Sequence, residues 1–178
     1  MRLIARLRRF SAARSGLAAL EFAILLPMMV LLLFGAVELI DVLGSNRRAE
    51  NTTASLADVI SRDTEVTDEE VEGLWRATEI LMVPDNAADL NLRITSISIQ
   101  DAATARVVWS EGRGMAARIA NSTVSLPADM MRPGTSIIMA ESEYQYVSPI
   151  GMIIGSPMTL NHTAYRRSRL IDPIPRET

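Results

Sequence analysis

The sequence predicts an α+β protein with a long N-terminal transmembrane helix, which continues into an amphipathic helix, and a small head with one further helix and an antiparallel sheet of about four strands. Three observations support this prediction. An apolar stretch at Leu17–Leu43 is long enough to cross a bilayer. A helix start signal follows at Thr67, and from Leu90 the apolar residues recur at every second position, which is typical of strands.

The distribution of charge along the chain predicts how the apolar segment is oriented in a membrane. Residues 1–16 hold five Arg and no acidic residue, whereas the whole chain has 18 basic and 21 acidic residues, so that residues 17–178 carry a net charge of −8 (13 − 21). Between the two regions, Phe22–Val37 runs for 16 residues without a charge. The positive-inside rule therefore predicts a cytoplasmic N-terminus and an external head. This topology explains the basic end better than nucleic-acid binding does, and we expect no nucleic-acid partner.

A cleaved secretory signal peptide is the alternative for the N-terminal region. Its apolar region usually has about 7–15 residues and ends at a cleavage site of small residues. The apolar run here is longer, and Val37-Glu38-Leu39 is a poor cleavage site. We therefore expect a retained anchor, with a basic leader at 1–16, a transmembrane helix at 17–43, an extracytoplasmic head at 44–166 and a mobile tail at 167–178.

The composition argues against several kinds of catalytic site. The chain has no Cys, a single His and, because all 18 basic residues are Arg, no Lys. It therefore lacks a thiolate nucleophile, a catalytic lysine and the usual set of zinc ligands. We predict that the protein is not an enzyme and that it has no catalytic residues, no cofactor and no metal site.

A short motif marks the start of the apolar stretch. Gly16 stands five residues before Glu21, within the sequence GLAALEFAILLP that ends at Pro27. This segment resembles the processing motif of type IV prepilins and, more narrowly, the TadE-like (TadE/TadF) minor pseudopilins of tight-adherence (Flp, type IVc) pili. The resemblance covers about Arg14–Glu38. It implies a pilin-like fold, cleavage between Gly16 and Leu17 by a prepilin peptidase, and an assembly role for Glu21, with Phe22 after it.

The same resemblance implies a location and partners. The protein would cross the bacterial inner membrane once, with its head in the periplasm, and incorporation into the pilus remains open. Its partners would be the prepilin peptidase, other pilin or pseudopilin subunits, the inner-membrane pilus assembly platform and membrane lipid. Its function would be to promote pilus initiation, assembly or adhesion.

Physical chemistry gives Glu21 a reason to be present. An acidic residue within a bilayer is costly unless it is paired, although the cost falls near the membrane surface, where Glu21 could also simply sit. Cleavage after Gly16 would free an α-amine on Leu17, which is mostly protonated at neutral pH. Pairing with the amine of a neighbouring subunit would fix the register between subunits. Pro27 lacks an N–H group and predicts a kink in the helix.

The head begins with two helical segments. We predict that the first helix continues over Ser45–Arg62, with one face made of Ala49, Thr53, Leu56, Val59 and Ile60. A capping box follows at Thr67 and Glu70, flanked by a hydrophobic staple of Val66 and Val71. The expected core stripe of the second helix consists of Val71, Leu74, Trp75, Thr78, Leu81 and Met82, and Pro84 marks its end.

Strand patterns follow in the second half of the chain. Leu90, Leu92 and Ile94 alternate in one phase and Ile97 and Ile99 in the other, which predicts a bulge in this strand near Thr95–Ser96. Further strands are expected at 106–110, 136–147 and 158–165. Glu111–Gly134 could hold a short helix or an irregular loop.

An apolar loop between two prolines, residues 148–157, is a candidate contact site. Its residues of interest are Pro149, Ile150, Met152, Ile153, Ile154 and Pro157. An exposed loop of this kind would contact a partner or the membrane, whereas a loop tucked under the sheet would belong to the core. Both interpretations remain open from the sequence. Tyr144 and Tyr146, on the strand before the loop, also resemble the TadE-like pattern.

A second function class is compatible with the same sequence. An uncleaved, single-pass, membrane-anchored binding module would keep its basic N-terminus and bind a ligand or an envelope partner with its extracytoplasmic head. A mature chain that begins at Met1 would favour this alternative, and one that begins at Leu17 would favour the pseudopilin.

Overall fold

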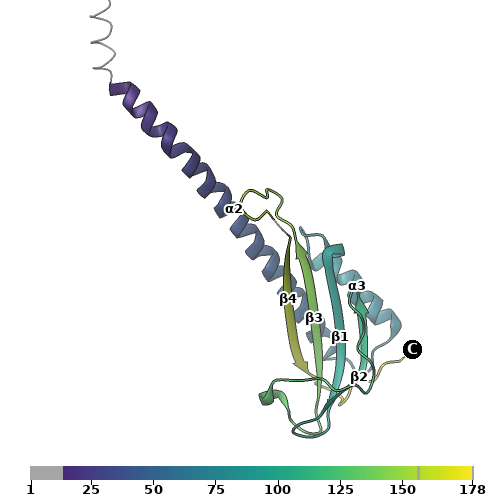
Figure 1. Ribbon diagram of the computed structural model, residues 1–178. Helices are drawn as coiled ribbons and strands as arrows, with labels where there is room; N and C mark the ends of the chain where they lie inside the picture. The colour runs from purple at the N-terminus through teal and green to yellow at the C-terminus, as the bar shows by residue number, and fades with distance from the viewer. Residues whose placement is uncertain (1–13, 156, 178) are drawn as a thin grey trace, which may run out of the picture.

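The computed structural model describes residues 14–155 and 157–177, and the leader predicted at 1–16 lies mostly outside this range. A long helix, α2 (Arg14–Ile60), extends well beyond the head, and its C-terminal part packs on a four-stranded antiparallel sheet (Figure 1). A second helix, α3 (Asp68–Leu81), lies beside the end of α2. The predicted α+β architecture is confirmed.

Helix α2 combines the predicted transmembrane and amphipathic segments in one uninterrupted helix. Its side chains are exposed almost without a break from Gly16 to Val37, and burial begins at Glu38. Beyond that point the buried face includes Ala49, Thr53, Leu56 and Ile60, as predicted. Val59 is 51% exposed, so its assignment to this face is wrong. With Leu56 and Ile60 facing the sheet, Val59 falls outside the stripe of about 100° that an amphipathic helix buries.

Helix α3 begins at the predicted capping box. The Thr67 backbone N–H donates to Glu70 Oε2 at 2.7 Å, and the Glu70 N–H donates to Thr67 Oγ1 at 3.3 Å. The two staple residues Val66 and Val71 both lie in the main core. Most of the predicted stripe is buried, but Leu81 is 42% exposed, because at about 100° per residue it lies at the edge of the face that Val71 and Met82 bury.

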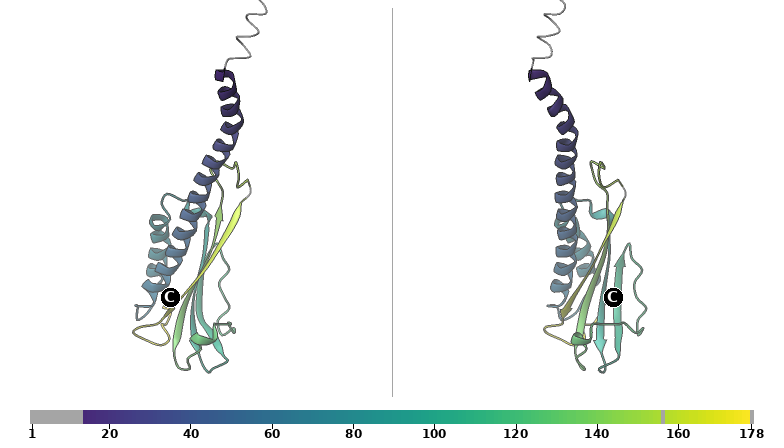
Figure 2. Two further views of the ribbon diagram at one scale, coloured as in Figure 1. Left: turned by 90° about the vertical axis from the view of Figure 1, so that its left-hand side faces the viewer. Right: turned by 60° about the vertical axis from the view of Figure 1, so that its left-hand side comes forward.

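The sheet has the strand order β2-β1-β3-β4, and all neighbours are antiparallel. Helix α2 packs against β3 and β4, and Figure 2 shows it crossing one face of the sheet. Between β2 and β3 the chain is irregular apart from a short 3-10 helix, η2 (Ala128–Met130), and a similar turn, η1 (Ala87–Asp89), precedes β1. The strands are β1 (Leu90–Ile99), β2 (Ala105–Arg113), β3 (Ser136–Tyr146) and β4 (Met158–Arg167).

The phase change in β1 has a different origin from the one predicted. Pairing between β1 and β3 runs from Leu90 to Ser98 without a shift, so β1 carries no extra residue. The irregularity lies in the pairing with β2, where Ser96 pairs with Trp109 and the next residue, Ile97, pairs with Val107. The extra residue is therefore in β2. Strand β1 changes phase because it is buried on both faces.

Two separate apolar clusters explain this two-sided burial. Leu90, Leu92 and Ile94 face the main core beneath the helices, together with Trp109 of β2. Ile97 and Ile99 face a smaller cluster on the opposite side, which the irregular segment after β2 covers with Val124, Leu126, Met130 and Met131. Because of the bulge in β2, Val107 pairs with Ile97, whereas Trp109 pairs with Ser96 and lies in the main core.

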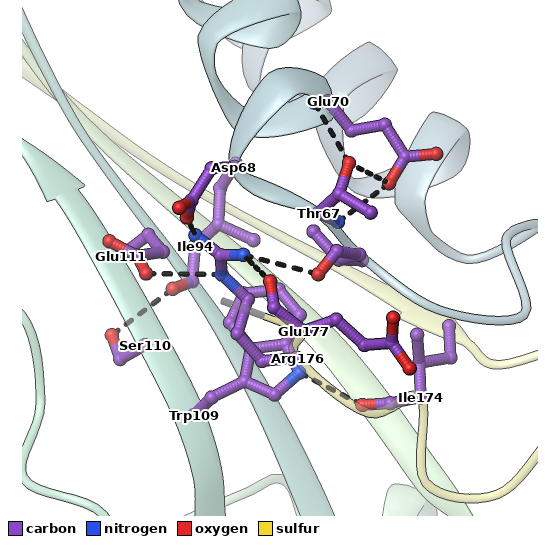
Figure 3. A network of polar contacts seen from close by, with 11 residues as sticks. Thr67, Asp68, Glu70, Ile94, Trp109, Ser110, Glu111, Ile174, Arg176 and Glu177 are labelled. Carbon is purple, nitrogen blue, oxygen red and sulfur yellow. Dashed lines mark hydrogen bonds and ion pairs between the residues drawn. The ribbon is translucent and has the colours of Figure 1, made fainter.

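The C-terminal segment is docked on the head, contrary to the predicted mobile tail. Ile174 is fully buried, and its carbonyl accepts a hydrogen bond from the indole N–H of Trp109 at 2.8 Å. The Arg176 guanidinium contacts Asp68 and Glu111 (Figure 3). The backbone of this segment bridges to Val66. Because the tail fills part of the core and Arg176 pairs with two acids, it is an integral part of the fold.

Candidate functional site

The N-terminal arm of α2, residues 16–37, contains most of the residues that the sequence singles out. Gly16 lies in open surroundings, where a Cβ atom would meet nothing within 4 Å. Leu17 is 59% and Phe22 58% exposed, and Glu21 is exposed as well. Within the described part of the chain, the Glu21 side chain makes neither a hydrogen bond nor an ion pair. The predicted cleavage and assembly residues are thus all accessible on one free helical arm.

Pro27 lies inside this arm, and the helix continues through it. The predicted kink stays a prediction, although Figure 2 shows α2 changing direction in its N-terminal part. Among the described residues, α2 is the helix long and apolar enough to cross a membrane, and none of its apolar window is buried inside the head. It is suited to be a membrane anchor.

A buried carboxylate marks the point where the arm meets the head. Glu38 is only 1% exposed. Its two oxygens accept the backbone N–H groups of Met152 at 2.5 Å, Ile153 at 3.0 Å and Ile154 at 2.6 Å. Hydrogen bonds from three successive N–H groups to one carboxylate are charge-assisted, and they hold residues 152–154 of the loop between β3 and β4 against α2.

Sequence reasoning did not assign a role to Glu38. The available signal was its position, since it is the first charged residue after the uncharged run Phe22–Val37. Its partners are backbone groups more than 110 residues further along the chain, which no local pattern reveals.

Further polar contacts continue along the same side of α2. The Tyr146 hydroxyl donates to Asp41 Oδ2 at 2.8 Å, and Arg48 pairs with Asp85 at 2.7 Å while also reaching the hydroxyl of Ser45. These residues follow Glu38 at helical spacing and face the head. Together they connect α2 to the end of β3 and to the segment after α3.

The loop predicted at 148–157 combines both interpretations that the sequence left open. Ile154 packs against the main core. Ile150, Met152 and Ile153 are 41%, 49% and 56% exposed, although Ile153 Cγ1 comes within 3.5 Å of where a Cβ atom at Gly35 would lie. Pro149 and Pro157 are exposed at the two ends of the loop. One side of the loop is thus attached to α2 and the core, while the side chains of Ile150, Met152 and Ile153 are exposed.

The arm of α2 lies within a segment that matches a known protein family. Residues 16–58 match the family described as TadE-like protein. The predicted resemblance is confirmed over this TadE-like segment, which includes Gly16, Glu21, Pro27 and Glu38 and ends two residues before the end of α2. Comparisons with curated proteins and with solved structures gave no match.

The family match associates the chain, at a coarse level, with tight-adherence pilus components and pilus subunits. It covers the helix that the sequence predicts to be the membrane anchor and leaves the sheet of the head outside. The TadE-like segment therefore contains both the exposed arm and the junction residues Glu38, Asp41 and Arg48.

Proposed function

We propose that this protein is a minor pseudopilin-like component of a tight-adherence (Flp, type IVc) pilus assembly system. A prepilin peptidase cleaves it between Gly16 and Leu17, and the mature chain promotes pilus initiation, assembly or adhesion. The observation that carries the proposal is the free apolar arm of α2, which presents the glycine, the new N-terminus and Glu21 within the TadE-like segment.

The proposal explains why a long arm stays free of the head. An apolar helix exposed on all sides needs lipid or other helices around it. Before assembly the inner membrane supplies lipid, with the basic N-terminus in the cytoplasm and the head in the periplasm. During assembly the equivalent arms of pilin subunits replace the lipid.

Glu21 supplies a specific contact in this exchange. Cleavage produces an ammonium group on Leu17, and an unpaired carboxylate in an apolar helix bundle is strongly unfavourable. Pairing Glu21 with the N-terminus of a neighbouring subunit satisfies both charges and selects one axial register. The exposure of Glu21 on the isolated chain is consistent with a partner supplied by another subunit.

The test is complementation of a deletion strain with Glu21→Ala, Glu21→Gln and Glu21→Asp. We expect normal protein levels in the membrane, with fewer pili in the first two variants and partial recovery with Asp. Glu50→Ala is the matched control, because Glu50 is an exposed acid on the same helix within the head. Normal piliation with Glu21→Ala, or an equal loss with Glu50→Ala, would contradict the register role.

A further inference from the structure

The loop that connects β3 to β4 forms an exposed apolar patch beside α2. The loop extends past the end of the sheet toward the arm of α2 (Figure 1). Residues 144–161, which include it, carry no charged side chain. At the same level, Leu39 and Ile40 on α2 are 55% and 72% exposed. The boundary patch, as we name it, consists of Leu39, Ile40, Leu43, Ile150, Met152 and Ile153.

The length of the arm places this patch at a membrane surface. A hydrocarbon core is about 30 Å thick, which corresponds to about 20 helical residues at ~1.5 Å each. A core centred on the uncharged run Phe22–Val37 extends from about Leu20 to about Leu39. Glu38 and the loop bonded to it therefore lie at the level where α2 leaves the bilayer.

Several backbone N–H groups of the loop have hydrogen-bond partners within the protein, as an apolar environment requires. Irregular backbone enters lipid only where its polar groups have partners within the protein. Glu38 accepts the N–H groups of Met152, Ile153 and Ile154, and the N–H of Gly151 donates to Ser148 Oγ at 3.1 Å. Four successive N–H groups are thereby satisfied without water, while the side chains of Met152 and Ile153 point outward.

We propose that this loop inserts into the headgroup and acyl-chain boundary of the leaflet from which α2 emerges, with Glu38 as its anchor. The occupant of the boundary patch is phospholipid. Its apolar surface continues the lipid-facing surface of the arm, and the carboxylate is hidden from lipid by the N–H groups it binds. The head is then attached to the membrane at two points, the helix and the loop, which limits its tilt relative to the membrane surface. The proposal requires only that α2 crosses a bilayer and does not depend on cleavage or pilus assembly.

The absence of Cys allows a direct test with single-cysteine variants of the full chain. Met152→Cys reports on the loop, Leu32→Cys on the arm and Ile119→Cys on the head, at positions that are 49%, 71% and 80% exposed. Each variant carries a nitroxide spin label and is reconstituted in vesicles of phosphatidylcholine and phosphatidylglycerol. Collision rates are measured with oxygen, which concentrates in lipid, and with a neutral nickel chelate, which stays in water.

We expect the oxygen-to-nickel collision ratio at Met152 to be several-fold higher than at Ile119 and to approach that at Leu32. A ratio at Met152 equal to that at Ile119 would overturn the proposal. Protection of Met152 from both reagents would also overturn it, because the loop would then be covered by protein, such as a second copy of this chain. All three labelled positions are exposed, so the variants should retain the fold, which circular dichroism would verify.

A second variant tests the anchor. Combining Met152→Cys with Glu38→Gln removes the charged acceptor, and the ratio at Met152 should fall toward the value at Ile119. Combining it with Glu50→Gln, which changes an exposed acid of α2 within the head, should leave the ratio unchanged. An unchanged ratio with Glu38→Gln would overturn the anchoring role of Glu38.

Discussion

The Tyr146 hydroxyl, at the end of β3, donates a hydrogen bond to Asp41 on α2 across 105 residues of sequence. Tyr146 is 2% exposed. Burial and the neighbouring Asp41 raise the pKa of the Tyr146 phenol above its ordinary value, so the hydroxyl keeps its proton throughout the neutral range. This contact joins the strand before the apolar loop to α2, one helical turn beyond Glu38. It holds the sheet against the part of α2 that adjoins the exposed arm.

Replacing Tyr146 with Phe should weaken this junction. We expect the free energy of unfolding to fall by about 1.5 kcal/mol, because a hydrogen bond to a charged acceptor is lost while the ring is kept. The measurement is denaturant unfolding of the full chain in detergent, followed by the fluorescence of Trp75 and Trp109, both of which lie in the head. Tyr165→Phe is the control, because no hydrogen bond of the Tyr165 hydroxyl occurs among the described residues. Equal effects of the two substitutions would argue against the Tyr146–Asp41 bond as the cause.

A second prediction concerns acid stability. Glu141 on β3 accepts hydrogen bonds from Arg93 Nε at 2.8 Å and from Arg118 Nη2 at 2.9 Å. Burial alone would raise the pKa of Glu141, but these two arginines outweigh burial and hold the pKa below its ordinary value. The stabilisation by the ionised form is therefore complete above the unfolded-state pKa of about 4.3 and is lost as the pH falls through the lower folded-state pKa.

Unfolding experiments between neutral pH and about pH 3 would test this direction of the pH dependence of stability. Glu141→Gln should lower the unfolding free energy most at neutral pH, and the difference from the parent chain should shrink on acidification. Glu72→Gln, at an exposed position of α3, should show little difference at any pH. A destabilisation by Glu141→Gln that stays constant with pH would contradict the assignment.

The docked tail yields a third prediction. Ile174 is fully buried in the main core, so Ile174→Ala should reduce the free energy of unfolding by about 2–5 kcal/mol through lost burial and a residual cavity. Ile171 is 42% exposed, and Ile171→Ala is the matched control with an expected small effect. The same fluorescence measurement applies. Similar small effects of both substitutions would show that the tail does not stabilise the head.

Cleavage can be tested without disturbing the fold. A side chain at Gly16 meets no other part of the described chain, so Gly16→Leu should preserve the folded head and its insertion. We expect the variant to keep its leader, because the leucine side chain would crowd the peptidase subsite that accepts glycine. An immunoblot that resolves the two forms would show only the longer one. Normal processing of Gly16→Leu would indicate that the peptidase does not read this position.

Local signals in the sequence predicted much of the fold. The capping box of Thr67 and Glu70 acts over four residues, and the apolar run that begins at Phe22 needs no distant partner to be recognised. These features depend on neighbours along the chain. They were therefore visible in the sequence and appear in the structure at the same residues.

The predictions from the sequence are wrong or incomplete where distant segments of the chain meet. The phase change in β1 depends on a second apolar cluster, which residues after β2 supply, so alternation alone suggested a bulge in the wrong strand. The docking of Ile174 depends on Trp109, 65 residues earlier. The burial of the Glu38 carboxylate likewise depends on N–H groups of the loop between β3 and β4. Long-range pairings of this kind leave no periodic trace near the residues concerned.

The intact mass of the protein purified from native membranes would show whether the chain is processed as a pseudopilin. We expect a chain that begins at Leu17, which exposes the amine that Glu21 of a neighbour can bind. A chain that begins at Met1, in cells with an active prepilin peptidase, would refute this processing. The anchored binding module would then be the better description of the protein.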